Sequence, residues 1–298
     1  SRQTRRQMPT PIESVPPPPA RACRWLRIGV VVFVLAMVAW RWDARTGFTA
    51  LIRFGDDFAG RRLPEVAGLA VAGVPGAGYD GQFYAQLAVN PDFRAPEVQA
   101  ALDNPPYRVR RIGLSLLAHG LGAGSPWATL QVYALLNTAA WLAFAWLCWR
   151  EIGAATPHAT LRWCAVVLAL GALDSVRLSL TDLPSTLLVL LAARYARKAK
   201  PLAAAAWLLA ACLARETAIL ACPMFWDGDW RSKRSWLRFF LASAAGAAPL
   251  LLWALWLHFT LVGQSGGIGN LLLPGQGLVY HLVECGTSLW SGDRKSVV

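Results

Sequence analysis

Residues 28–42 read IGVVVFVLAMVAWRW, an apolar run that predicts a membrane span over about 26–42. Residues 127–149, WATLQVYALLNTAAWLAFAWLCW, form a second run of this kind. Both segments have the roughly 17–25 residues that a helix needs to cross a bilayer. The chain of 298 residues is 55% hydrophobic and only 15% charged, whereas a soluble domain carries about 25% charged residues. The sequence therefore predicts an all-α integral membrane protein.

Further apolar segments predict a polytopic helical bundle of about seven spans in all. They cover 161–180, 183–197, 201–226 and 236–262, with a turn at 181–182. Arg215, Glu216 and Thr217 interrupt the segment 201–226, which is either two short helices meeting there or one span with Arg215 and Glu216 buried as a pair. Because charges are costly inside a membrane, this pair is a candidate functional feature in either form.

The net charge of +12 lies in short basic clusters between apolar runs, such as RYARKAK (194–200) and RSKR (231–234). This placement is typical of cytoplasmic loops, and no nucleic-acid motif accompanies it, so no nucleic-acid partner is expected. Six arginines within residues 1–27, before and at the start of the first span, predict a cytoplasmic amino terminus. The polar segment from about 43 to 125 then becomes a long first loop on the extracytoplasmic side.

That orientation requires residues 108–121 not to cross the membrane. Arg108, Arg111, Ser115 and His119 fall on one helical stripe, and the leucines face away. The pattern predicts an amphipathic helix lying at the membrane interface.

Both ends of the chain differ in composition from the rest. Residues 1–24 begin basic and proline-rich, which predicts a disordered cytoplasmic tail. The membrane domain is expected over 25–292. The charged ending 293–298 is interpreted as a cloning or sequencing artefact, with the natural protein continuing beyond it.

The first loop contains the segment most suited to chemistry, GYDGQFYAQLAVNPDF (78–93). Asp80 could accept a proton from an acceptor hydroxyl as a general base, or it could cap the helix that begins after it. The later cluster Arg108, Arg110 and Arg111 could hold phosphate oxygens or lipid headgroups.

Metal and cofactor sites have weak support. The six cysteines form no CxxC motif, and the four histidines are scattered. Asp56 and Asp57 are secondary catalytic candidates that more often form a solvated turn. No cofactor is expected, although a divalent ion with either aspartate stays open.

Two motifs in this loop, Gly78–Tyr84 and Asp103–Arg111, resemble a bacterial group of polytopic cell-surface glycopolymer proteins. That group is similar in layout to type-C (GT-C) glycosyltransferases, which use polyprenyl-phosphate-linked sugars. The resemblance implies a GT-C-like bundle whose first extracytoplasmic loop carries interfacial helices, with Asp80 as the catalytic acid/base. It implies phosphate contacts at Arg108 and Arg111, and a further cavity residue at Arg215. The expected substrate-binding set is Tyr79, Gln82, Tyr84, Tyr107, Arg108, Arg111, Arg215 and Glu216.

The expected function is transfer of a sugar from a polyprenyl-phosphate donor to a cell-surface glycan or glycolipid, on the outer face of the bacterial inner membrane. The expected partners are the lipid bilayer, the lipid-linked sugar and the glycan acceptor. The alternative is a non-enzymatic membrane component that binds or translocates lipid-linked glycan. The concentration of charge in outer loops rather than within the spans favours the enzyme.

Overall fold

The computed structural model describes residues 20–261, and these are mostly helical. Within residues 20–261, three helices are long and apolar enough to cross a membrane: α1 (Ala20–Ala39), α7 (Pro126–Ile152) and α12 (Lys233–Thr260). Helices α8 (Pro157–Val167) and α9 (Leu170–Leu178) are bent by 42° and make a fourth span if they count as one. The three or four candidate spans in this described part are fewer than the seven or so expected, because several predicted segments form helices shorter than a bilayer requires.

The remaining elements are short. Between α1 and α7 lie η1 (Thr49–Leu51), β1 (Phe54–Gly55), η2 (Asp56–Arg61), α2 (Pro64–Ala67), β2 (Gly73–Val74), α3 (Gly81–Val89), α4 (Pro96–Ala101), α5 (Pro105–Val109) and α6 (Gly113–Leu121). After α9 come α10 (Asp182–Arg197), α11 (Pro201–Ala214) and the 3-10 helix η3 (Glu216–Phe225). The strands β1 and β2 are parallel and pair Phe54 with Gly73.

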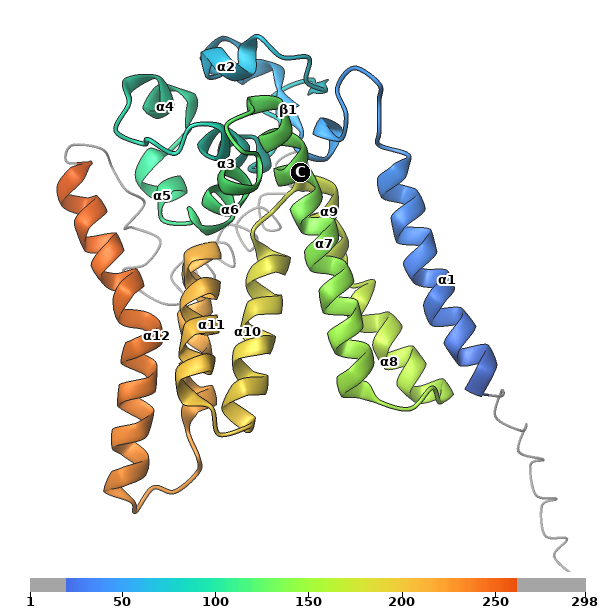
Figure 1. Ribbon diagram of the computed structural model, residues 1–298, viewed down its shortest axis with the longest axis vertical. Helices are drawn as coiled ribbons and strands as arrows, with labels where there is room; N and C mark the ends of the chain where they lie inside the picture. Colours follow the sequence, from blue (N-terminus) through green and yellow to red (C-terminus); the bar gives the residue numbers. More distant parts are fainter. Residues whose placement is uncertain (1–19, 262–298) are drawn as a thin grey trace, which may run out of the picture.

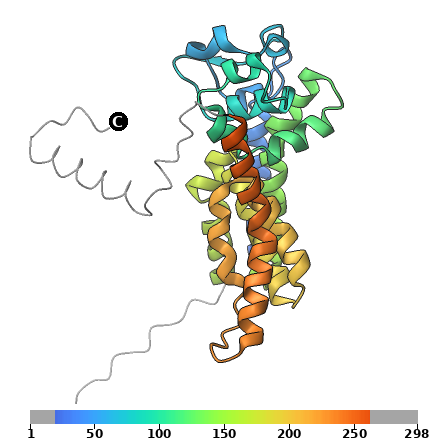
Figure 2. The ribbon, with the colours of Figure 1, turned by 90° about the vertical axis from the view of Figure 1, so that its left-hand side faces the viewer.

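The elements between α1 and α7 form a layer over one end of the long helices, which we call the capping layer (residues 43–125) (Figure 1). A view turned by 90° shows this layer at the same end of a narrow bundle (Figure 2). The last turns of α12 pack against it, since Phe93 makes edge-on ring contacts with Trp253 and Trp256. The indole Nε1 of Trp253 also donates to the carbonyl of Val109 at 3.3 Å. The predicted loop is thus a folded layer that contacts the bundle.

Local signals explain where α7 begins. Ser125 caps α7 by accepting a hydrogen bond from the amide of Ala128, and Pro126 occupies the first turn, both of which favour a helix start. Helix α1 already begins at Ala20. The disordered tail expected over 1–24 was therefore wrong for residues 20–24, while residues 1–19, 262–298 and the suspected artefact at 293–298 lie outside the described part.

The segment predicted as one interfacial helix over 108–121 is instead two helices, α5 and α6. Its polar stripe faces the protein: Ser115 Oγ donates to the Tyr84 carbonyl at 2.8 Å, and His119 Nδ1 lies 2.9 Å from the Ala88 carbonyl. Leu117 and Leu121 are exposed as expected, whereas Leu114, which was expected on the same outward face, is buried. The prediction of a polar stripe was correct, but the stripe points toward the protein rather than toward water. Ser115 and His119 make hydrogen bonds with backbone carbonyls of α3.

Segment 201–226 takes the first of the two forms left open by the sequence. Helix α11 ends at Ala214, and η3 begins at Glu216 after the extended residue Arg215. Arg215 and Glu216 do not pair with each other: each reaches a different element. This break brings two charged side chains beneath the capping layer.

Candidate functional site

Two glycines fix the position of Asp80 in the capping layer. Gly78 has a φ of +68°, and a Cβ there would lie 2.4 Å from the carbonyl oxygen of Arg53. At Gly81 a Cβ would lie 2.4 Å from the carbonyl oxygen of Leu178, at the end of α9. Only glycine permits both the backbone conformation and the close approach. Gly78 and Gly81 therefore allow the segment that carries Asp80 to pack closely against the end of α9.

Arg108 binds two carboxylates, those of Asp80 and Asp103. Its Nη2 donates to Oδ1 of Asp80 at 2.9 Å, and its Nη1 lies 2.8 Å from Oδ2. Its Nε and Nη2 lie 2.7 and 2.6 Å from the two oxygens of Asp103. The Arg108 side chain is 5% exposed, whereas that of Asp80 is 43% exposed. Arg108 therefore orients Asp80, whose carboxylate reaches solvent.

Arg111 forms a second buried ion pair, with Glu216 at the start of η3. Its Nε and Nη2 donate to the two Glu216 oxygens at 2.6 and 2.7 Å, a fork geometry that suits arginine and carboxylate. The same guanidinium donates to Tyr84 Oη at 3.2 Å and to Tyr107 Oη at 2.6 Å. Arg111 thus ties the capping layer to the helix bundle.

The pKa values of this cluster follow from burial and these partners. Burial raises the pKa of Tyr84, and the nearby Arg111 and Arg108 oppose this without cancelling it. Burial also raises the pKa of Glu216, but hydrogen bonds from Arg111 outweigh that effect and the net pKa is lowered. For Arg108, burial lowers the pKa, and hydrogen bonds to Asp103 and Asp80 more than compensate. The cluster at neutral pH is therefore a set of ion pairs with a neutral tyrosine between them.

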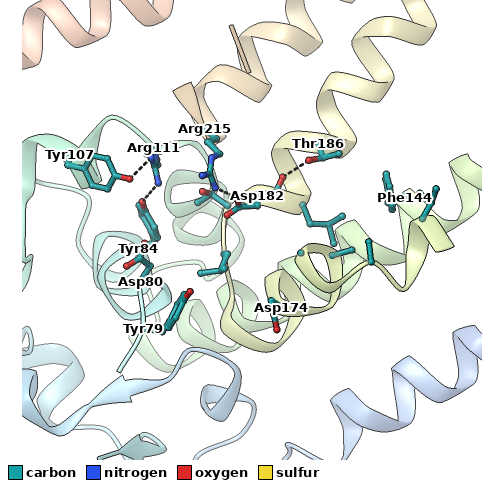
Figure 3. A pocket seen from close by; sticks show the side chains of 17 residues that line it. Tyr79, Asp80, Tyr84, Tyr107, Arg111, Phe144, Asp174, Asp182, Thr186 and Arg215 are labelled. Atoms are coloured by element: carbon teal, nitrogen blue, oxygen red, sulfur yellow. Dashed lines mark hydrogen bonds and ion pairs between the residues drawn. The ribbon is translucent and has the colours of Figure 1, made fainter. Parts of the chain in front are cut away.

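A cavity of about 560 Å³ opens beside this cluster, between the capping layer and α7, α9 and α10 (Figure 3). This volume lies within the range of ordinary small-molecule sites. Its polar lining side chains are Tyr79, Asp80, Tyr84, Tyr107, Arg111, Asp174, Thr181, Asp182, Thr186 and Arg215. Phe144, Val166, Ala172 and Leu183 contribute apolar walls. A ligand here would meet acids, arginines and tyrosines together with an apolar surface.

Tyr84 and Tyr107 line this cavity and can act as hydrogen-bond donors toward a ligand. Tyr84 Oη accepts from Arg108 at 3.3 Å and from Arg111 at 3.2 Å, which occupies both lone pairs of the hydroxyl. Within residues 20–261 its own proton has no acceptor. The Tyr84 hydroxyl can therefore donate to a ligand oxygen, and Tyr107, bound by Arg111, can do the same.

The structure brings most of the predicted site residues together, but not all of them. Tyr79, Asp80, Tyr84, Tyr107, Arg111 and Arg215 line the cavity, and Glu216 contacts it through Arg111. Arg108 lies behind Asp80 and does not line it. Asp80 occupies the N-cap position of α3, as the capping alternative predicted, but its side chain makes no capping hydrogen bond.

Three predicted residues lie elsewhere. Gln82 is fully buried, where it accepts from the Gly55 amide at 3.0 Å and donates to the Ala77 carbonyl at 2.7 Å. Its contacts hold the loop that carries Asp80. Asp56 and Asp57 are exposed at the start of η2 and do not line the cavity. The structure thus separates the adjacent acidic pair from Asp80.

Sequence reasoning missed three acids of the site: Asp103, Asp174 and Asp182. Asp103 stands five residues before Arg108 in DNPPYRVRR. Helix α5, which begins with Pro105 and Pro106, brings the two side chains into contact. Asp182 was noted only as part of a turn, and its pairing with Arg215 is tertiary. Among residues 20–261, no group of three or more His, Cys, Asp or Glu side chains is arranged to hold a metal ion. Comparison with known proteins found no matching family model, no matching curated protein and no matching solved structure.

Proposed function

We propose that this protein is a membrane glycosyltransferase that transfers a sugar from a polyprenyl-phosphate donor to a cell-surface glycan or glycolipid. The observation that carries the proposal is the position of Asp80. Its half-exposed carboxylate lies on the wall of a cavity that also presents arginines and arginine-bound tyrosine hydroxyls. A base beside a group of phosphate-binding donors is the combination that this reaction needs.

The chemistry can be assigned to these side chains. The acceptor oxygen forms a bond to the anomeric carbon while the bond between that carbon and the donor phosphate oxygen breaks. Asp80 takes the proton of the acceptor hydroxyl. The departing phosphate gains negative charge, which Arg111, Arg215 and the two tyrosine hydroxyls are placed to stabilise.

The distribution of charge supports an outward-facing site. The start of α1, the α10–α11 turn and the start of α12 lie at the end of the bundle opposite the capping layer (Figure 1). These termini carry the basic clusters RYARKAK (194–200) and RSKR (231–234). Since basic residues favour the cytoplasmic side, the capping layer and its cavity belong outside, on the outer face of a bacterial inner membrane.

The test is sugar transfer in membranes by wild type and by Asp80→Asn, with a panel of radiolabelled polyprenyl-phosphate sugars. We expect wild type to transfer from at least one donor and Asp80→Asn to lose about 10²–10⁴-fold in rate. Glu65→Gln is the matched control, because Glu65 is an exposed acid of the same layer that does not line the cavity.

Other outcomes would count against the proposal. Equal donor binding by both proteins, without transfer from any donor, would favour a carrier of lipid-linked glycan. Transfer by Asp80→Asn at the wild-type rate would remove Asp80 as the base.

A further inference from the structure

A second cavity, of about 470 Å³, adjoins the first between α10 and η3. Its own lining includes Val189, Ala218, Leu220 and Ala221, with Ser185 and Thr217 as polar members. Three residues line both cavities: Asp182, Thr186 and Arg215. The boundary between a cavity rich in charged groups and a more apolar one is therefore formed by a single ion pair and a threonine.

That ion pair joins the first residue of α10 to the break between α11 and η3. Nη1 of Arg215 donates to Oδ1 of Asp182, and Thr186 Oγ1 donates to the carbonyl of Asp182 at 2.9 Å (Figure 3). The two charged side chains come from segments that are 33 residues apart. Separating them would remove the ion pair from the boundary between the two cavities.

The three arginines nearest the cavity differ in how firmly they are held. Arg108 contacts two carboxylates, and Arg111 binds Glu216 through two nitrogens while also contacting two tyrosines. In residues 20–261, Arg215 has one partnered side-chain nitrogen, and its side chain is 31% exposed. The Asp182 side chain is 44% exposed. Since exposed ion pairs contribute little net stability, the Asp182–Arg215 pair is easier to break than the ion pairs of Arg108 and Arg111.

We propose that the Asp182–Arg215 pair is a gate: a phosphate ester displaces Asp182 from Arg215, and the chain attached to that phosphate occupies the second cavity. This inference rests on the proposed function for the class of substrate. A phosphate group can engage a guanidinium through two oxygens, whereas the Asp182 contact uses one nitrogen. The displaced Asp182 carboxylate stays in the first turn of α10, where the helix dipole favours negative charge.

The charges around the first cavity favour this location for the phosphate. Asp80 and Asp174 line that cavity on the side away from Arg215 (Figure 3) and repel a phosphate anion. The apolar groups of the second cavity give an alkyl chain a surface to bury. The phosphate is thus held at the boundary, with the sugar on the side of Asp80 and the chain on the side of Leu220.

The test is equilibrium binding to the full chain in detergent micelles, with farnesyl monophosphate, inorganic phosphate and farnesol as probes. Removing the competing carboxylate by Asp182→Asn should tighten farnesyl monophosphate binding about two- to fivefold. Arg215→Gln should weaken it by about 10–150-fold, the loss of a charged hydrogen-bonded contact. Inorganic phosphate and farnesol should each bind more weakly than farnesyl monophosphate. Arg41→Gln, which removes an exposed arginine that lines neither cavity, should leave binding unchanged.

The sign of the Asp182→Asn effect decides the matter. Weaker or unchanged binding would show that Asp182 positions Arg215 rather than competing with the ligand, and would overturn the gate. Inorganic phosphate or farnesol binding as tightly as farnesyl monophosphate would also overturn it. If Arg215→Gln does not fold, the near-isosteric Asp182→Asn still gives the answer. The expected binding order without sugar transfer by wild type would retain the gate and remove the transferase.

Discussion

Two regions of this molecule bury arginines, and they compensate the charge in different ways. In the capping layer, Arg108 and Arg111 bind the carboxylates of Asp80, Asp103 and Glu216. At the far end of the bundle, the fully buried Arg27 of α1 has no carboxylate partner among the described residues.

Arg27 is held instead by neutral groups of α7 and α8. It donates to Thr160 Oγ1 at 3.2 Å and to the carbonyls of Gly153 and Ala154 at 3.4 Å each. Its guanidinium lies 5.1 Å from the ring centre of Trp149, which adds a cation–π contact. The comparison suggests different roles. Neutral partners fasten α1 to the α7–α8 turn, whereas carboxylates leave charged oxygens beside a cavity.

The largest effect that can test this comparison is expected from Glu216→Leu. This change leaves Arg111 buried without its counter-charge, which costs about 3–5 kcal/mol. The measurement is the free energy of unfolding in detergent micelles. The double variant Arg111→Met/Glu216→Leu removes both charges and should recover most of the loss. A single variant as stable as wild type would mean that water reaches this pair in solution.

A smaller effect is expected from Arg27→Met. No counter-charge is left behind, only carbonyl and hydroxyl oxygens that lose a donor, so the expected loss is about 1–3 kcal/mol in the same assay. Arg24→Met is the control, because Arg24 is exposed on the same helix. If Arg27→Met were as damaging as Glu216→Leu, neutral partners would be as demanding as charged ones, and the distinction between the two regions would fail.

Features that depend on local sequence could be predicted, whereas contacts between distant segments could not. The spans over 26–42 and 127–149 were found because long apolar runs depend on local composition alone. Asp80 and Arg111 were identified by residue type and position in one polar loop, and the structure places both at the cavity.

Their partners could not be predicted in this way. Arg111 and Glu216 are 105 residues apart, so their pairing depends on how α11 and η3 pack beneath the layer. The break between α8 and α9 was also missed. It falls in the apolar run 165–173, which holds no proline and reads as a continuous span.

The smallest effect is expected from acid, which should weaken the capping layer and spare the region around Arg27. The net pKa of Glu216 is lowered from 4.5, because the hydrogen bonds and charge of Arg111 outweigh burial. The stability contributed by this shift is present above about pH 4.5 and is lost as the pH falls through the lower pKa of the folded protein. Protonation leaves a carboxyl group that still fills its site and can accept hydrogen bonds, so the loss should be smaller than that of Glu216→Leu.

The measurement is the melting temperature of wild type, Glu216→Gln and Arg27→Met between pH 7 and pH 3. Wild type and Arg27→Met should lose stability in parallel, and Glu216→Gln should lose less. Identical pH profiles for wild type and Glu216→Gln would contradict the assignment of this acid sensitivity to the Arg111–Glu216 pair.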